Sequence, residues 1–177
     1  MSVLTPSGHI TKLCEPESLP DSAFEPRIYV DKALRMYSYP EALVIDMLVS
    51  NGLRVSEVLN VRIKDVLSKR KFIVQGLKGS FNRVCTTSFL DIKVYSNGKS
   101  EDRIFQRFNR YYIRRVCDKI GLVCQVKGNE KSAVTHSARH LYVESLKNSG
   151  VSTDDIQIAI GHKNKKSTIY YEQHKPI

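Results

Sequence analysis

The chain has 177 residues, of which 28 are Lys or Arg and 18 are Asp or Glu, so the formal net charge is +10 and the sequence pI is about 9.5. A hydrophobic content of 41% and a charged content of 26% are ordinary for a globular protein, which excludes a disordered chain and indicates one domain with its own core. The basic excess makes a polyanion the first partner to consider.

The first 26 residues differ in composition from the rest. They hold one lysine against four acidic residues, a net charge of −3, which leaves +13 on residues 27–177. Their four prolines oppose regular secondary structure. We therefore expect an extended N-terminal segment at 1–26, without catalytic groups, followed by a strongly basic folded domain at 27–177.

Two helices are predicted next. Apolar residues recur at helical spacing after Glu41, and Asn51-Gly52 is typical of a helix end, because both residue types readily take the left-handed conformation. A short second helix is expected to begin near Val55.

A β-hairpin is predicted after these helices. Residues 71–75 and 83–88 are rich in β-forming side chains, and the glycine-containing stretch 76–79 lies between them. This pattern indicates two antiparallel strands joined by a loop longer than two residues.

A long helix is predicted from Ser100 to Gly121. Ser100 is a good capping residue, and the acidic residues after it complement the helix dipole. Arginines recur along one face of this predicted helix and can bind phosphate or simply face solvent. They are Arg103, Arg107, Arg110 and Arg114.

Short helices are expected to fill the last third of the chain. One runs from about Ser137 to Ser149, and Ser152 caps another that ends at Gly161. The predicted fold is therefore mostly α with a small antiparallel β-sheet, an α+β arrangement.

The cysteines and the hydropathy indicate a soluble protein of the reducing cytosol. The four cysteines form no C-x-x-C pair, which fits neither a zinc knuckle nor a disulfide scaffold. The longest apolar stretch, 42–49, contains Asp46 and is too short for a membrane span. We expect free thiols, a cytoplasmic location and no membrane partner.

Two patterns in the first half could carry chemistry. Arg54 and Glu57 are three positions apart and would share a face of the short helix, although such a pair is more typical of a surface ion pair. Lys78 lies between glycines in the predicted hairpin loop, where a lysine is usually just solvated.

The second half adds two imidazoles, a guanidinium and two phenols. His136 and Arg139 lie three apart at a predicted helix start, where backbone N–H groups add to the side-chain donors for an anion. Helix capping and surface packing are the alternative there. His162 follows a glycine, and Tyr170 and Tyr171 lie near the end of the chain. Each of these three alone would be interpreted as structural.

Together these residue types describe one reaction. Forked arginines match the oxygens of a phosphodiester and stay charged at any working pH. A tyrosine hydroxyl becomes a nucleophile when cations and a base are near it, and histidines exchange protons at neutral pH. These are the groups needed for transesterification at a DNA phosphate without a metal or another cofactor.

The order and spacing of these residues resemble the tyrosine recombinases, also called the phage integrase family. That family's pattern is an Arg in a G-L-R-x-S-E stretch, a hairpin Lys, an H-x-x-R-H box, and a G-H followed nine positions later by the nucleophilic Tyr. The resemblance covers roughly residues 40–175. The matching residues in this sequence are Arg54, Glu57, Lys78, His136, Arg139, His162 and Tyr171.

The resemblance implies how DNA would be cut. Tyr171 would attack the scissile phosphate, form a covalent 3′-phosphotyrosyl link and release a 5′-hydroxyl, so that rejoining requires no ATP. Arg54 and Arg139 would stabilise the pentacoordinate transition state. Lys78 would protonate the leaving 5′ oxygen.

The resemblance also implies roles for the other residues of the pattern. His136 would assist proton transfer at the tyrosine, His162 would hydrogen-bond the phosphate, and Glu57 would hold Arg54 in place. Tyr170 is the competing nucleophile, but it falls one position short of the family spacing, which favours Tyr171.

Two features depart from the common family pattern. Only the segment 1–26 precedes the match, where many members have a separate helical domain that completes a clamp around DNA. Only six residues follow Tyr171, too few for the helix that many relatives pass to a neighbouring subunit. We expect double-stranded DNA as the partner, weak DNA binding by the isolated chain, and self-association as a tetramer on DNA.

Three other functions are compatible with parts of the sequence. Relaxation of supercoiled DNA in the manner of type IB topoisomerases uses a similar site, but those enzymes usually have a Lys at the first position of the H-x-x-R box. A non-catalytic DNA-binding module would keep the fold without the turnover. A metal-dependent nuclease would rest on Asp154-Asp155, which are more typical of a helix cap.

Overall fold

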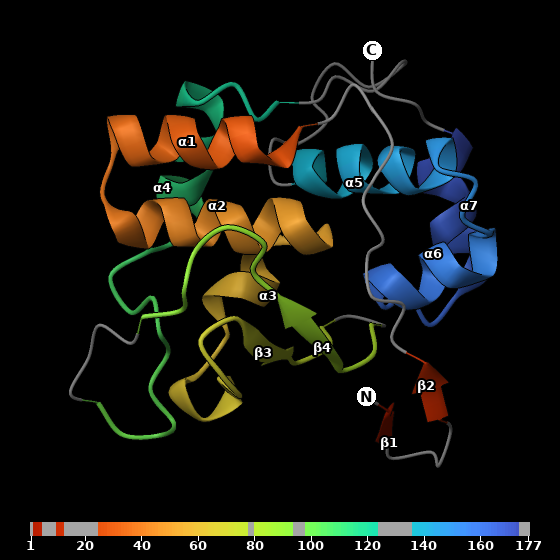
Figure 1. The fold of residues 1–177 in the computed structure, drawn as a ribbon, viewed down its shortest axis with the longest axis horizontal. Coiled ribbons are helices and arrows are strands. Elements are labelled where there is room, and N and C mark those ends of the chain that lie inside the picture. Colours follow the sequence, from red (N-terminus) through yellow and green to blue (C-terminus); the bar gives the residue numbers. More distant parts are fainter. Residues whose placement is uncertain are drawn as a thin grey trace.

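The computed structural model describes residues 2–4, 10–12, 25–77, 80–93, 98–123 and 136–173, with the backbone alone at 2–4, 10–12 and 171–173. Helices form most of this part of the chain, and two short hairpins complete it (Figure 1). The helices are α1 (Pro26–Met36), α2 (Tyr39–Asn51), α3 (Val55–Leu59), the 3₁₀ turn η1 (Ile63–Asp65), α4 (Arg110–Lys119), α5 (Ser137–Asn148), α6 (Thr153–Ile160) and α7 (Lys165–Gln173). The strands are β1 (Ser2–Leu4), β2 (Ile10–Lys12), β3 (Lys71–Val74) and β4 (Arg83–Thr86).

Helix α2 is the centre of the main core. Every residue from Glu41 to Val49 is buried, because α1, α3, α4, α5 and β4 all contact this helix. A helix enclosed on all sides is apolar all round rather than on one stripe. It ends as predicted, with Gly52 in the left-handed conformation at φ 58°.

Asp46, the charge inside this apolar stretch, has a structural use. Its carboxylate accepts hydrogen bonds from the backbone N–H groups of Ser88, Phe89 and Leu90, at 3.1, 3.0 and 2.7 Å. A buried carboxylate is tolerated when several donors satisfy it. Asp46 therefore fixes the segment that follows β4 against α2.

The predicted hairpin is confirmed. Strands β3 and β4 pair antiparallel, with Phe72 opposite Cys85, and both of these residues are buried. The short helix predicted near Val55 is α3. The mostly helical fold with a small antiparallel sheet is therefore as predicted.

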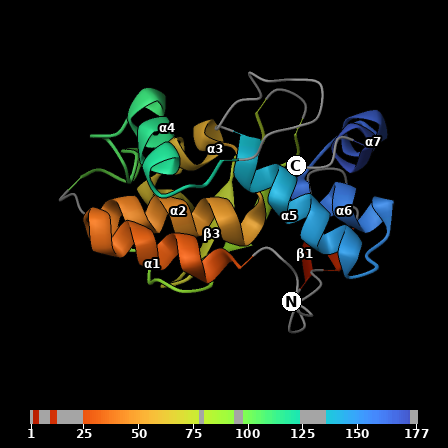
Figure 2. The same ribbon diagram turned by 90° about the horizontal axis from the view of Figure 1, so that it is seen from above.

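Helices α5, α6 and α7 contact one another and gather at the C-terminal end of α2 (Figures 1 and 2). Val143, Ile156 and Ile160 form a second, smaller core between α5 and α6. Both helices agree with the predictions, including the Ser152 cap, whose hydroxyl accepts from Asp155 N. This packing places α7 against α5 and α6, and Thr168 of α7 contacts His162 in the candidate site.

The long helix predicted from Ser100 is wrong in its first half. Backbone carbonyls of Ser100 and Asp102 accept from the N–H groups of Lys64 and Ile63, both at 2.9 Å, so these residues pair with the chain near η1. The Asp102 side chain closes a turn on Lys99 N. The helix begins only at Arg110, where the Asn109 side chain provides the cap.

The arginine stripe is therefore not continuous along one helix. Arg103 and Arg107 precede α4, while Arg110 and Arg114 are exposed on it. Their spacing matches a helical period that the chain does not adopt before residue 110.

The remaining expectations concern the N-terminal segment, the cysteines and membrane spans. The N-terminal segment, expected to lack regular structure, contains the short antiparallel pair β1 and β2, and α1 was not anticipated. Cys85 and Cys117 are free and buried, while Cys14 and Cys124 lie outside the described residues. None of the helices in the described part of the chain has the length and apolar character of a membrane-spanning segment.

Candidate active site

Glu57 lies at the centre of the candidate site. It occupies the first turn of α3, where its Oε2 accepts from the backbone N–H of Arg54 at 2.8 Å and so helps to cap the helix. Its side chain is fully buried, and Nη2 of Arg139 donates to the same oxygen at 2.9 Å. Arg54 Nη1 lies 3.5 Å from the other carboxylate oxygen. The predicted pair is therefore not a surface ion pair.

Arg83, at the start of β4, is a third partner of this carboxylate and was assigned no role from the sequence. Its Nη1 and Nη2 donate to the two oxygens of Glu57 at 3.4 and 3.3 Å, and its side chain is only 10% exposed. The available signal was an arginine opening a strand directly after the glycine-rich loop. Nothing in that pattern pairs it with a residue 26 positions earlier.

The charge state of Glu57 follows from these contacts. Burial raises the pKa of the carboxyl, but the charges of Arg83 and Arg139 and the hydrogen bonds that it accepts outweigh burial, so the pKa is lowered overall. One carboxylate thus faces three guanidinium groups, and the cluster keeps a positive charge. Such a cluster is suited to binding an anion.

Arg139 is held on three sides and is fully buried. Its Nε donates to the carbonyl of Gly52 at 2.8 Å, Nη2 to Glu57, and Nη1 lies 3.0 Å from Nε2 of His162. Helix α5 supplies the arginine and the end of α2 supplies the carbonyl. The left-handed Gly52 is needed there, because a β-carbon at that position would come within 2.6 Å of Tyr142.

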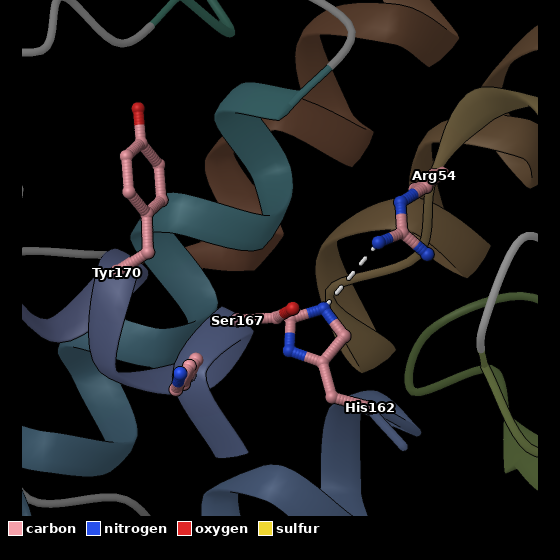
Figure 3. A pocket seen from close by; sticks show the side chains of 5 residues that line it. Arg54, His162, Ser167 and Tyr170 are labelled. Atoms are coloured by element: carbon pink, nitrogen blue, oxygen red, sulfur yellow. Dashed lines mark hydrogen bonds between the residues drawn. The ribbon is translucent and has the colours of Figure 1, made fainter. Parts of the chain in front are cut away.

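His162 joins the two predicted arginines. Its Nε2 lies 3.3 Å from Arg54 Nη2 (Figure 3). The same atom lies 3.0 Å from Arg139 Nη1, and Nδ1 lies 3.2 Å from the hydroxyl of Thr168 in α7. The imidazole is buried. Its backbone pairs with Ser80, whose hydroxyl accepts from Arg54 Nη1 at 2.9 Å.

Both candidate histidines favour the neutral form. Burial, followed by the charges of Arg139 and Arg54, lowers the pKa of His162 to about 3. Burial, followed by Arg54 and Arg139, also lowers the pKa of His136, which is the N-cap residue of α5. A neutral imidazole can accept a proton, as a general base requires.

A cavity of about 400 Å³ opens beside these residues. It is lined by Arg54, His162, Lys166, Ser167 and Tyr170 (Figure 3). Lys166 and Ser167 were given no part in the chemistry from the sequence, and they enter the site because α7 begins beside His162. Figure 3 shows Tyr170 and Arg54 on opposite sides of the cavity.

Four of the predicted site residues meet in hydrogen-bond contact, and His136 lies within their electrostatic reach. The four are Arg54, Glu57, Arg139 and His162. Lys78 lies outside the described residues, and only the backbone of Tyr171, within α7, is described.

The acidic pair considered as a metal site has other partners. Asp155 accepts from the hydroxyl of Ser152 at the α6 cap, and Asp154 lies 2.6 Å from Lys165 Nζ. Within the described ranges, no group of His, Cys, Asp and Glu side chains is arranged to hold a metal ion.

Known proteins resemble this chain in sequence and in fold. The model of the phage integrase family matches residues 27–176. A probable integrase/recombinase protein of Methanocaldococcus jannaschii is 32% identical over 151 residues, which cover 76% of this chain and 46% of that protein. The chain spans about half the length of the curated relatives that it matches.

Solved structures share the fold. A crystal structure of XerA recombinase superposes with a TM-score of 0.62 at 23% identity, over 91% of this chain and 61% of that one. The XerH site-specific recombinase bound to its difH substrate gives a TM-score of 0.57 at 20% identity, over 84% and 48%. Since the family match extends over most of the sequence and includes every residue of the candidate site, the chain belongs to the phage integrase family.

Proposed function

We propose that residues 27–177 form the catalytic domain of a site-specific DNA recombinase that cuts and rejoins double-stranded DNA through a 3′-phosphotyrosyl intermediate. Arg54 and Arg139 bind the scissile phosphate, and Tyr171 is the nucleophile. The family match and the names of the relatives, which are integrases and recombinases, support strand exchange.

The arrangement of the two arginines carries this proposal. Nη2 of Arg54 and Nη1 of Arg139 both approach one acceptor, Nε2 of His162, at 3.3 and 3.0 Å. Two guanidinium groups that converge on one acceptor atom can equally converge on the non-bridging oxygens of a phosphodiester. Arg54 reaches this point from the cavity side, since it lines the cavity and its side chain is 23% exposed.

The proposed reaction is a transesterification at one phosphorus atom, in which one ester bond forms as another breaks. The Tyr171 oxygen forms a bond to phosphorus while the bond from phosphorus to the 5′ oxygen breaks. His136, neutral because its pKa is lowered, takes the tyrosine proton, and Lys78 gives a proton to the leaving oxygen. Rejoining is the reverse sequence with a new 5′-hydroxyl, so neither ATP nor a metal ion is consumed.

Position 171 suits this role by its place in α7. It follows Ser167 by four residues and Thr168 by three, so these positions share one face of the helix. Ser167 lines the cavity and Thr168 contacts His162. Tyr170 also lines the cavity, but Figure 3 shows its hydroxyl pointing away from the Arg54–His162 pair.

Duplex DNA, self-association on DNA and a cytoplasmic site of action complete the proposal. The net charge of +10 supports binding to the DNA backbone, whose contacts are electrostatic and carry no sequence information. Strand exchange joins two duplexes and four strands, which requires several protomers on one assembly. We propose a tetramer for this reason.

A nicked duplex carrying the DNA that flanks the protein's own gene tests the proposal. After cleavage the short fragment that carries the new 5′-hydroxyl diffuses away. The protein stays attached to the 3′ end of the other fragment as an adduct that is visible on a denaturing gel. Tyr171→Phe is expected to abolish the adduct, whereas Tyr170→Phe, the matched control one position away, should retain it. Excess chelator should leave the yield unchanged.

Other results would select other functions. An adduct lost in Tyr170→Phe and retained in Tyr171→Phe would reassign the nucleophile. DNA binding by the wild-type protein without an adduct at any flanking sequence would indicate a non-catalytic module, and relaxation of plasmids that lack these sequences would indicate a topoisomerase.

A further inference from the structure

The hydrogen bonds around His162 fix the position of its proton. Nε2 faces two guanidinium groups, Arg54 at 3.3 Å and Arg139 at 3.0 Å. A guanidinium group only donates, so Nε2 must be the acceptor and carry no hydrogen. The single proton of the neutral imidazole is then on Nδ1, which donates to Thr168 Oγ1 at 3.2 Å.

This assignment conflicts with the role proposed for His162 at a phosphate. A phosphate oxygen only accepts, so a histidine that hydrogen-bonds it through Nε2 must carry the proton on that nitrogen. Once a phosphate occupies Arg54 and Arg139, the two donors that made Nε2 an acceptor are engaged elsewhere. The ring can then move its proton to Nε2, provided that Nδ1 still finds a partner.

Thr168 can supply that partner in both states. A hydroxyl can accept one hydrogen bond and donate another, and its hydrogen rotates to suit. The Thr168 side chain is fully buried, so water does not compete easily for the contact with Nδ1. No charged group could replace it in this way, because a carboxylate only accepts and an ammonium only donates.

We propose that Thr168 is a positioning residue that allows His162 to change its tautomer: its hydroxyl accepts from Nδ1 in the free protein and donates to Nδ1 when a phosphate occupies the two arginines. The inference rests on the proposed function, because the phosphate is that of the cleaved DNA. The exchange moves one proton from Nδ1 to Nε2 through solvent and leaves the imidazole neutral.

The charges around His162 favour this neutral exchange over a gain of a proton. Arg54 and Arg139 contact the imidazole, and Arg83 lies close enough to lower its pKa further, while Glu57 alone acts in the opposite direction. Three positive groups against one negative group disfavour an imidazolium ion. A change of tautomer provides a donor at Nε2 without adding charge.

The same contact links His162 to the helix of the nucleophile. Thr168 lies in α7, three positions before Tyr171, and the Thr168–His162 contact ties this helix to the loop after α6. An α7 that shifts must therefore break this contact or carry His162 with it. Thr168 thus couples the position of the nucleophile to the readiness of the phosphate site.

Nitrogen NMR of the histidine-labelled protein tests the tautomer directly, before any DNA substrate is known. The wild-type His162 should show a protonated Nδ1 and an unprotonated Nε2, and inorganic phosphate should convert it to the opposite pattern. Thr168→Val, which keeps the shape and removes the hydroxyl, should keep the Nδ1–H pattern in the free protein, because the two arginines still require an unprotonated Nε2. Phosphate should no longer convert this variant to the opposite pattern, and Thr168→Ser should restore the conversion. The proposal fails if the free wild-type protein carries the proton on Nε2, if phosphate does not change the wild-type pattern, or if phosphate converts Thr168→Val as fully as the wild type.

Cleavage of the nicked duplex supplies the functional measurement. Thr168→Val should cleave about tenfold more slowly at saturating protein, as expected for one lost hydrogen bond, with DNA affinity unchanged and with recovery in Thr168→Ser. Thr87→Val is the matched control, since Thr87 is also buried and donates to the carbonyl of Leu90 at 2.6 Å, away from the site. Equal cleavage rates for the two valine variants would overturn the role of Thr168. If the wild type cleaves no DNA, the proposed function fails, while the NMR spectrum still decides the tautomer.

Discussion

Gly161 packs directly against the guanidinium group of Arg83. A β-carbon built on the glycine would come within 2.5 Å of Arg83 Nη1, and the glycine itself has φ 72°. Its carbonyl also accepts from Phe81 N at 2.8 Å. One residue therefore ends α6, leaves room for the arginine that holds Glu57, and places His162 next in the chain.

This contact explains why a glycine precedes His162. The arginine needs close approach to the backbone at the point where the chain turns out of α6. Only a residue without a β-carbon allows both the left-handed turn and the approach. Contacts that take no part in the chemistry thus hold the site residues in position.

Gly161→Ala tests this support. The substitution should lower the free energy of unfolding by about 2 kcal/mol or more, because left-handed strain adds to the displacement of Arg83. Gly150→Ala is the matched control: Gly150 has φ 78° with nothing within 4 Å of a built β-carbon, so only the strain of about 1 kcal/mol should appear. Urea unfolding measures the free energy of unfolding of both variants. Equal losses would show that displacing Arg83 costs no stability.

Much of the fold could be predicted from the sequence because local signals and burial agreed. The Asn51-Gly52 helix end, the β3–β4 hairpin and the Ser152 cap are local features, and each lies where it was predicted. The helix predicted from Ser100 failed because its cap and acidic residues are used by a loop that pairs with the chain near η1. Long-range pairing of that kind has no local signature.

In the candidate site, too, local patterns could be predicted from the sequence and long-range contacts could not. Order and spacing pointed to Arg54, Arg139 and His162, and their convergence is a property of the fold. Arg83 and Thr168 are in the same sequence, but the partner of Arg83 is 26 positions away and the partner of Thr168 lies in the loop before its helix. Neither residue type is unusual at its position. Supporting residues are therefore harder to predict than the groups they support.

Arg83→Met should weaken the fold and the site together. The methionine keeps part of the apolar stem but removes two charged donors from buried Glu57, which should cost about 2 kcal/mol of unfolding free energy. The cleavage rate should also fall, because Glu57 would hold Arg54 and Arg139 less firmly. Arg27→Met is the control, since the exposed Arg27–Asp31 pair should contribute only a few tenths of a kcal/mol. Similar losses in both variants, measured by chemical unfolding, would contradict the role given to Arg83.

Glu57→Gln should lower stability most at neutral pH. The pKa of Glu57 is lowered in the folded state, so its contribution is present above the usual pKa of a glutamate, near 4.5, and is lost as the pH falls through the folded value. The variant leaves three arginines facing a neutral amide, which should cost about 3–5 kcal/mol at pH 7. Unfolding curves of both proteins from neutral to acidic pH should therefore converge on the acid side. Glu101→Gln, at an exposed carboxylate paired with Arg62 and Lys64, should change little, and a constant gap for Glu57→Gln would contradict the pKa shift.

His162→Gln should make the protein less sensitive to mild acid. In the unfolded chain a histidine gains its proton near pH 6.5, whereas folded His162 resists protonation down to about 3, because it is buried between Arg139 and Arg54. The unfolded state therefore binds the extra proton first, and the wild type should lose stability as the pH falls from about 6.5 towards the folded value. Glutamine can still offer an oxygen to the two arginines but does not titrate. Since His136, whose pKa is also lowered, remains in both proteins, the difference between their unfolding free energies across this range isolates His162. Parallel curves would mean that His162 is protonated in the folded protein as readily as in the unfolded chain, and would remove the basis for treating it as a neutral imidazole.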